Sequence, residues 1–190
     1  MGNYEKRTGG INMDRSLRGL INNKNGALFE SEIIGGCMAY SLQERAFIEK
    51  TPEPFKVSKP LENGFFKGRF TSKSQPDFKG TLKDGLSIVF EAKYTSTDKI
   101  RADVLTENQM ECLEKHYKLG AITGVVTGIQ DQFFFVPWKL WRLVYEQYRR
   151  QYLRPEDIQA YRVKFNGNVN FLDLKNGGKV ERKEEYKIGD

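Results

Sequence analysis

Several features common in other protein classes are missing from this sequence. It holds one histidine, two cysteines and no apolar run approaching the ~18 residues that a membrane helix needs. Residues 1–20 lack the apolar core of a secretory signal. Two cysteines are too few for a secreted disulfide framework. We therefore expect a chain that has no membrane span and works in the reducing cytoplasm.

Signatures of several enzyme classes are missing as well. The sequence has no G-x-S-x-G elbow, no phosphate-binding P-loop and no G-x-G-x-x-G fingerprint. A serine or cysteine triad would have to use His116, which sits among charged residues in a predicted helix. Cys37 and Cys112 fall on or beside apolar helix faces and lack zinc-type spacing. We expect a surface histidine and two core thiols.

Positive charge is in excess, and it is unevenly distributed. The net charge is +6 over 190 residues. Residues 1–24 hold five basic and two acidic groups, residues 50–73 hold six and two, and all other residues sum to −1. Neither segment has a regular hydrophobic period, so both are predicted to be irregular. Such basic segments suit a polyanionic partner.

Phenylalanines are interleaved with the charges of the second segment. Phe55, Phe65, Phe66 and Phe70 alternate with lysines and arginines, and prolines bracket the stretch. Basic and aromatic residues together can hold phosphates and stack on exposed bases. The alternative is a solvated loop whose phenylalanines pack back onto the core. Composition alone does not choose between these interpretations.

The rest of the chain alternates predicted helices and strands. The helices cover residues 25–43, 106–119, 137–148 and 155–160, and the strands cover 46–50, 75–79, 86–93, 121–128, 132–136, 161–165 and 169–174. Asp84-Gly85 predicts a hairpin. Gly35-Gly36 weakens the first helix by about 1 kcal/mol per glycine, which predicts a kink or an early stop. The order predicts an α+β domain with helices packed against a mixed sheet.

Three charged residues gather around one strand end. Strand alternation puts Glu91 and Lys93 on the same face, and Asp77 lies on the hairpin partner. Carboxylates that converge bind Mg²⁺ well, because this ion prefers hard oxygen ligands. Such an ion activates water and stabilises charge on a phosphoryl oxygen, and a nearby lysine holds the water or the phosphate. The alternative is a structural ion pair.

Two further polar residues occupy notable helix positions. Glu30 falls within the apolar half of its helix, where a carboxylate needs a partner, either a metal ion or Lys93. Gln109 completes a Thr106-x-x-Gln109 capping box at the start of another helix. Gln109 therefore has two candidate roles, in the helix cap or at the charged cluster.

These motifs have the form and order of a known nuclease pattern. Pro76-Asp77 followed by Glu91-Ala92-Lys93 has the form of the PD-(D/E)XK signature. With the segments 25–30, 75–80, 90–93 and 133–138 and with Gln109, the arrangement resembles the RecU-type Holliday junction resolvases over roughly residues 22–143. The resemblance implies a restriction-endonuclease-like fold, with a mixed central sheet flanked by helices and a basic stalk at about residues 51–74.

The resemblance also implies roles for individual residues. Asp77 and Glu91 correspond to metal ligands, and Glu30 to the helix carboxylate that binds the metal directly or through water. Lys93 corresponds to the group that positions or polarises the attacking water, and Gln109 to a glutamine that places phosphate or water. DNA contacts are expected from the basic and aromatic residues of the two charged segments: Arg15, Arg18, Lys24, Lys56, Lys59, Phe65, Phe66, Lys67, Arg69 and Lys73.

The expected protein is a Mg²⁺-dependent endonuclease, with Mn²⁺ as a substitute, that resolves four-way junctions as a homodimer and leaves 5′-phosphates. Residues 1–24 form a flexible arm, 25–150 the nuclease domain, and 151–190 an extension packed on it with a partly disordered tail. A helicase or strand-exchange protein is a conceivable partner. The alternatives are a restriction-like or repair endonuclease on other DNA, and a junction-binding accessory without catalysis.

Overall fold

A five-stranded mixed sheet forms the centre of the molecule. The computed structural model describes residues 15–52, 54–70, 75–178 and 180. The strand order is β1-β4-β5-β7-β8, in which β5 and β7 run parallel and the other neighbours antiparallel. The strands are β1 (Ala46–Lys50), β4 (Phe78–Leu82), β5 (Ser87–Thr95), β7 (Ile122–Ile129) and β8 (Gln132–Pro137). The predicted mixed sheet is confirmed.

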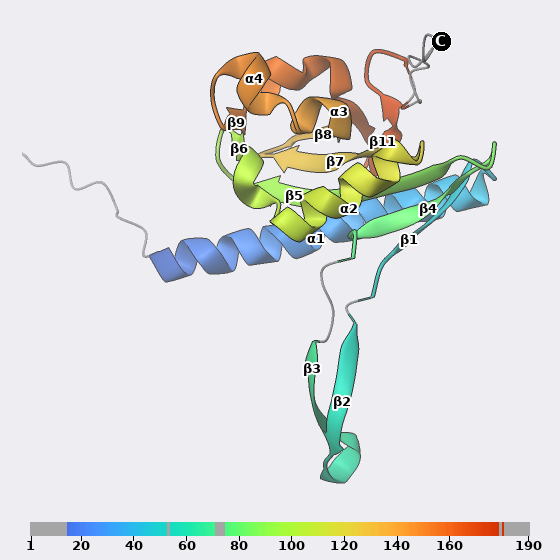
Figure 1. Ribbon diagram of the computed structural model, residues 1–190, viewed down its shortest axis with the longest axis vertical. Coiled ribbons are helices and arrows are strands. Elements are labelled where there is room, and N and C mark those ends of the chain that lie inside the picture. Colours follow the sequence, from blue (N-terminus) through green and yellow to red (C-terminus); the bar gives the residue numbers. More distant parts are fainter. Residues whose placement is uncertain (1–14, 53, 71–74, 179, 181–190) are drawn as a thin grey trace, which may run out of the picture.

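Helices cover both faces of this sheet (Figure 1). Helix α1 (Arg15–Leu42) packs on one face, where Phe29, Ile33 and Tyr40 enter an apolar core. Helices α2 (Glu107–Lys118) and α3 (Trp138–Trp141) pack on the other face. Full burial of one large apolar side chain contributes about 1.5–3 kcal/mol. The two cores therefore fix the sheet between its helical layers.

The first helix is longer than the sequence predicts. It begins at Arg15 rather than at residue 25, and it runs through Gly35-Gly36 without stopping. Residues 15–24 contain no proline, so the helix can extend past the body, as Figure 1 shows. A Cβ on Gly35 would lie 2.0 Å from Asn168 Oδ1, and one on Gly36 would lie 2.4 Å from the Val169 carbonyl oxygen. Because Gly35 and Gly36 have no side chains, Asn168 and Val169 can pack closely against the helix at this point. The helix is not broken there.

The basic segment after β1 is a β-hairpin and is not irregular, contrary to the prediction. Strands β2 (Phe55–Pro60) and β3 (Phe66–Phe70) pair antiparallel around the 3₁₀ turn η1 (Glu62–Gly64). Asn63 and Gly64 take φ values of 59° and 78°, a left-handed conformation that Asn-Gly adopts readily in hairpin turns. We call residues 55–70 the stalk, because the hairpin projects from the body (Figure 1).

The region after β8 is more segmented than predicted. The expected helix over residues 137–148 divides into α3 and α4 (Val144–Tyr148), because Leu143 between them has φ −107° and ψ 15°. The expected helix at 155–160 is the 3₁₀ helix η3 (Pro155–Tyr161), and the predicted strands that follow are the hairpin β10 (Val163–Phe165) and β11 (Val169–Leu174). Short elements complete the chain: β6 (Ile100–Arg101), η2 (Ala102–Val104) and β9 (Tyr152–Leu153).

The predicted hairpin at Asp84-Gly85 joins β4 to β5, with Gly85 at φ 83°. Both strands are displaced by one to three residues from the predicted ranges. This hairpin brings Asp77 beside the last residues of β5. Within residues 15–180, apart from the gaps given above, no helix combines the length and the apolar character that crossing a membrane requires.

Candidate active site

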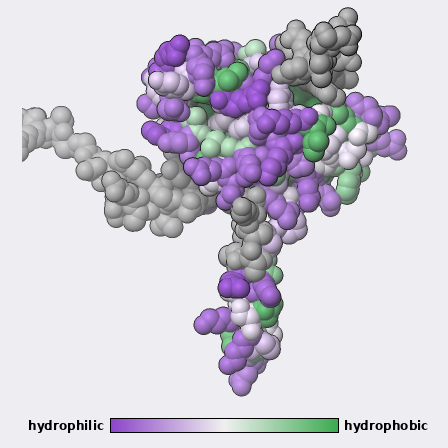
Figure 2. Space-filling view, viewed as in Figure 1, coloured by the Kyte–Doolittle hydropathy of each residue, from purple (hydrophilic) through white to green (hydrophobic). Residues whose placement is uncertain are grey.

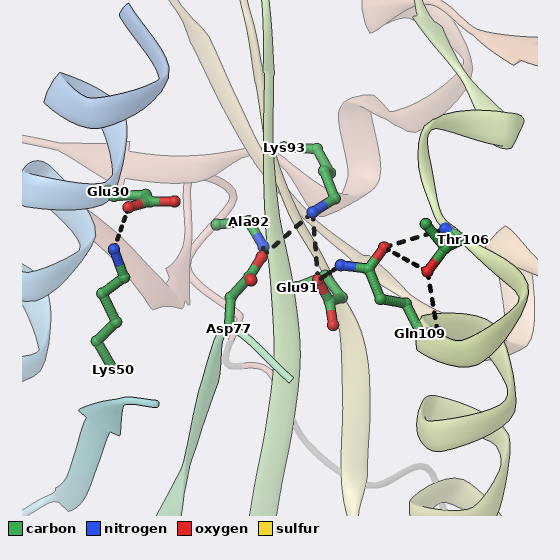
Figure 3. Close-up of polar contacts among 8 residues, drawn as sticks. All are labelled: Glu30, Lys50, Asp77, Glu91, Ala92, Lys93, Thr106 and Gln109. Atoms are coloured by element: carbon green, nitrogen blue, oxygen red, sulfur yellow. Dashed lines mark hydrogen bonds and ion pairs between the residues drawn. The ribbon is translucent and has the colours of Figure 1, made fainter. Parts of the chain in front are cut away.

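The candidate site lies at the end of the sheet where β4 begins and β5 ends. Asp77 immediately precedes β4, and its Oδ2 accepts a hydrogen bond from the Ala92 backbone N–H at 2.9 Å. The Thr51 N–H donates to the carbonyl oxygen of Asp77 at 2.9 Å. The first contact holds the Asp77 carboxylate against β5 (Figure 3), and the second holds the Asp77 backbone beside Thr51.

Glu91 is the fully buried carboxylate of the site. Its Oε2 accepts from Lys93 Nζ at 3.2 Å and from Gln109 Nε2 at 2.6 Å. Its Oε1 is also buried and has no hydrogen-bond partner among the described residues. Burial, followed by the charge of Asp77, raises the pKa of Glu91 to about 8. A buried oxygen left without a donor is open to a cation or a water molecule.

Lys93 bridges the two carboxylates, as Figure 3 shows. Its Nζ lies 3.3 Å from Asp77 Oδ2 and 3.2 Å from Glu91 Oε2, and its side chain is 22% exposed. Strand alternation sends Glu91 and Lys93 to the same face of β5. The predicted grouping of Asp77, Glu91 and Lys93 is therefore present in the structure.

Gln109 takes part both in the helix cap and in the charged cluster, the two roles that the sequence left open. Its Oε1 accepts from the Thr106 N–H at 3.0 Å, and its own N–H donates to Thr106 Oγ1 at 3.3 Å, which completes the capping box. Because the amide oxygen faces Thr106, the amide nitrogen faces Glu91. One side chain thus caps α2 and binds the buried carboxylate.

Glu30 does not contact Lys93, one of the two partners that were expected. It forms an ion pair with Lys50 at the end of β1 instead. Its side chain is 33% exposed, because Phe29 beside it occupies the core. Figure 3 shows this pair apart from the cluster around Lys93. Among the described residues, no three acidic, histidine or cysteine side chains converge closely enough to hold a metal ion.

Sequence reasoning missed Lys50 as a site residue. The sequence counts it only among the charges of the basic segment, although it is the last residue of β1, at the same sheet end as Asp77. Its position could have been predicted, because Lys50 is the last residue of a predicted strand and therefore lies at one end of the sheet. Pairing with a helix carboxylate 20 residues earlier depends on tertiary packing.

The predicted DNA-contacting residues of the stalk are exposed. Phe65 is 71% and Phe66 55% exposed, so the alternative in which these rings pack onto the core is wrong. Lysines and arginines flank them on both strands: Lys56, Lys59, Lys67 and Arg69. Figure 2 shows hydrophilic and hydrophobic side chains together on the projecting stalk.

The remaining predicted contacts are Arg15, Arg18, Lys24 and Lys73. Arg15, Arg18 and Lys24 belong to α1 and are part of a helix, not of an irregular arm. Lys24 is exposed. Lys73 and residues 1–14 lie outside the described residues. The positive charge before residue 25 is thus carried partly on a helix that extends past the sheet (Figure 1).

Comparisons with known proteins place the chain in a family. No curated protein matches it. It is similar to the solved structure of Hjc, a Holliday junction resolvase from Archaeoglobus fulgidus, with 13% identity, a TM-score of 0.39, and coverage of 61% of this chain and 75% of that one. The family model described as RecU, Recombination protein U, matches residues 24–176. The chain therefore belongs to the RecU family of Holliday junction resolvases.

Proposed function

We propose that this chain is a metal-dependent endonuclease that cuts opposed strands of a Holliday junction, with Asp77, Glu91, Lys93 and Gln109 as its active centre. The observation that carries the proposal is the buried Glu91, which binds Lys93 and Gln109 through one oxygen and leaves the other without a hydrogen bond among the described residues. A structural ion pair alone gives no reason to bury a carboxylate oxygen that receives no hydrogen bond.

The side chains fit a divalent cation. Glu91 Oε1 is an unsatisfied hard oxygen donor, and Asp77 adds a second carboxylate at the same strand end. Two carboxylates and retained waters are a common way for proteins to hold Mg²⁺, and Mn²⁺ accepts similar ligands. Glu30, on α1, is proposed to act through water once it leaves Lys50. Bound Mg²⁺ would activate a water and offset charge on the phosphoryl oxygens.

The chain's own residues orient the reacting groups. Lys93 Nζ, held between Asp77 and Glu91, is placed to donate a hydrogen bond to the attacking water or to a phosphate oxygen. Gln109 Nε2 holds Glu91 Oε2, so that its other oxygen stays oriented toward the site. Hydrolysis adds water across the P–O3′ bond: the hydroxyl ends on the 5′-phosphate and the proton on the 3′-oxygen.

The stalk is proposed to hold the junction at its crossover. Lys56, Lys59, Lys67 and Arg69 supply backbone contacts, and Phe65 and Phe66 offer exposed rings to unpaired bases. A four-way junction has near two-fold symmetry, so a homodimer suits it, with one strand cut by each subunit. Arg15, Arg18 and Lys24 would add phosphate contacts from α1. We also propose that the chain works in the cytoplasm, with a helicase or strand-exchange protein as a compatible partner.

Two other functions are separable by experiment. A duplex-specific endonuclease would be displaced from a four-way junction by an equal concentration of linear duplex. A junction-binding accessory would bind without cutting in Mg²⁺ or Mn²⁺. The buried carboxylate of Glu91, with Asp77 beside it, argues against the accessory, since a DNA-binding surface alone gains nothing from acids beside phosphates.

A cleavage assay on a synthetic mobile four-way junction tests the proposal. Wild-type protein should produce paired nicks with 5′-phosphates in Mg²⁺ and none in EDTA. Asp77→Asn should abolish cutting and leave junction binding nearly intact. Asp84→Asn, in the exposed turn at the other end of the hairpin, is the matched control and should cut normally. Normal cutting by Asp77→Asn would refute the metal-site assignment.

A further inference from the structure

A pocket outside the active centre lies beside the C-terminal hairpin. It has a volume of about 450 Å³ and is bounded by the β7–β8 turn at Asp131 and by the hairpin β10–β11. Its walls include Arg162, Lys164 and Lys175. We call it the hairpin pocket. Neither the resemblance nor the proposed active site gives this part of the chain a role.

Three basic residues belong to the lining of this pocket. Within the described residues, no salt bridge joins Arg162, Lys164 or Lys175 to a carboxylate. Lys164 does lower the pKa of Asp173 by its charge, but Asp173 is already bonded by Arg45 at 2.7 Å and 3.0 Å. Asp131 is the single acidic side chain in the lining. The pocket therefore keeps an excess of positive charge.

An aromatic ring and two amides accompany the cations. Phe165 is 48% exposed, and one side of its ring packs on Phe133 with centroids 4.7 Å apart. Asn166 Oδ1 accepts from Asn170 Nδ2 at 2.9 Å, so both amides hold fixed positions in the wall. These groups match the chemistry of a nucleotide. The cations suit its phosphate, the exposed ring suits its base or sugar, and the amides suit the polar edges of the base.

The pocket and the active centre share one end of the sheet. The Gln130 N–H, in the β7–β8 turn, donates to the Thr95 carbonyl oxygen at 2.9 Å, two residues beyond Lys93. From β5 to β8 is two strand spacings, or about 10 Å. The stalk joins β1 to β4 at this same end. Basic groups thus stand on both sides of the catalytic strands, the stalk on one and the hairpin pocket on the other.

We propose that the hairpin pocket binds a nucleotide of a DNA strand near the crossover, with its phosphate at Arg162, Lys164 and Lys175 and its base or sugar against Phe165. The inference rests on the proposed function, because it assigns a further DNA contact to the same resolvase. It also gives a role to the residues beyond 150, which hold one arm of the junction while the stalk holds the crossover.

Salt-dependent junction binding tests this assignment. Arg162→Gln, Lys164→Gln and Lys175→Gln are combined in the full chain, and fluorescence anisotropy is measured in EDTA over a range of salt concentrations. We expect the slope of log affinity against log salt to fall by about 0.9 for each phosphate that the protein no longer neutralises. Affinity at physiological salt should fall at least tenfold. An unchanged slope and affinity would overturn the proposal.

A matched control removes the same charge elsewhere. Lys83, Lys118 and Lys139 are exposed and lie at the opposite end of the sheet, where β4 ends, β7 begins and β8 ends. Their triple glutamine variant should keep the wild-type slope. If its slope falls as far as that of the pocket variant, net charge and not a site explains the effect, and the proposal fails. Single variants at exposed Lys164 and Lys175 serve if the triple variant unfolds.

A crosslinking experiment identifies what occupies the pocket. Junctions with 5-iododeoxyuridine at successive positions from the crossover are irradiated with the wild-type protein, and the crosslinked peptide is sequenced. Crosslinks to the peptide that contains Phe165 are expected, and they should disappear in Phe165→Leu. Crosslinks confined to the stalk would refute the pocket as a DNA site. Failure of wild-type protein to prefer junctions over duplex would instead refute the proposed function, so the two failures are distinguishable.

Discussion

Gln109 donates its side-chain amide to Glu91 at 2.6 Å while its carbonyl oxygen closes the cap of α2 at Thr106. The helix start and the orientation of the buried carboxylate are therefore set by one side chain. Neither role excludes the other, because the two ends of the amide face different partners. The two roles can nevertheless be separated by substitution.

Gln109→Glu should impair cleavage more than stability. Glutamate completes a capping box as well as glutamine does, but it cannot donate a hydrogen bond and adds a like charge beside Glu91. We expect single-turnover cleavage to fall about a hundredfold or more. Thr106→Ala is the converse control: removal of the cap should lower the free energy of unfolding by about 1 kcal/mol and leave cleavage near wild type. Equal cleavage by both variants would mean that Gln109 is only a cap.

Lys93→Met should remove cleavage while junction binding persists. Lys93 Nζ contacts both Asp77 and Glu91, and no other described cation forms a salt bridge with either carboxylate. We expect a loss of about 10²–10⁴-fold in single-turnover rate if Lys93 assists the attacking water. Affinity for the junction, measured in EDTA, should change less than about threefold, which is roughly 0.7 kcal/mol. Lys83→Met is the control, and cleavage by Lys93→Met at the wild-type rate would remove Lys93 from the mechanism.

Substitutions of Glu30 and of Lys50 should shift the Mg²⁺ concentration needed for cleavage in opposite directions. If Glu30 serves the metal through water, Glu30→Gln should raise the Mg²⁺ concentration needed for half-maximal cleavage. Lys50→Gln frees the Glu30 carboxylate from its ion pair and should lower that concentration. The measurement is a Mg²⁺ titration of cleavage rate for the two variants and wild type. No shift in either variant would restrict the Glu30–Lys50 pair to a structural role.

The Asp173–Arg45 ion pair should make stability depend on acid pH. Hydrogen bonding from Arg45 lowers the pKa of Asp173, so the pair stabilises the fold above the unfolded-state pKa, and this stabilisation disappears as pH falls through the lower folded-state pKa. Asp173→Asn should therefore destabilise the protein at pH 7, and its deficit should shrink below about pH 4. Urea unfolding from pH 7 to pH 3 measures this. A deficit independent of pH would show that packing, not charge, explains the destabilisation.

Local signals were sufficient for the catalytic strands. Alternation along β5 and the Asp84-Gly85 turn place Asp77, Glu91 and Lys93 together, because a two-strand hairpin needs only contacts between near neighbours in sequence. The capping box at Thr106 likewise depends on residues three apart. The predicted boundaries were less accurate, since strand ends depend on which neighbour continues to pair.

Long-range pairing accounts for what sequence reasoning missed. The stalk looked irregular because its prolines and glycines obscure the alternation, whereas the left-handed Asn63-Gly64 turn closes it into a hairpin. Lys50 meets Glu30 only when β1 packs on α1. Arg162 and Lys175, which flank β10 and β11, are brought together by a backbone hydrogen bond of 2.7 Å, so the linear distribution of charge could not reveal that cluster.

The stalk should contribute a separate part of the salt dependence of junction binding. Lys56, Lys59, Lys67 and Arg69 all lie on the exposed hairpin, and each phosphate contact releases counterions on binding. Changing all four to glutamine should flatten the slope of log affinity against log salt by up to about 3.6. The comparison is the triple variant of Lys83, Lys118 and Lys139, which should retain the wild-type slope. If the stalk variant also keeps the wild-type slope, the charged side chains of the stalk do not contact DNA. The exposed Phe65 and Phe66 would then have to bind DNA without the help of these charges.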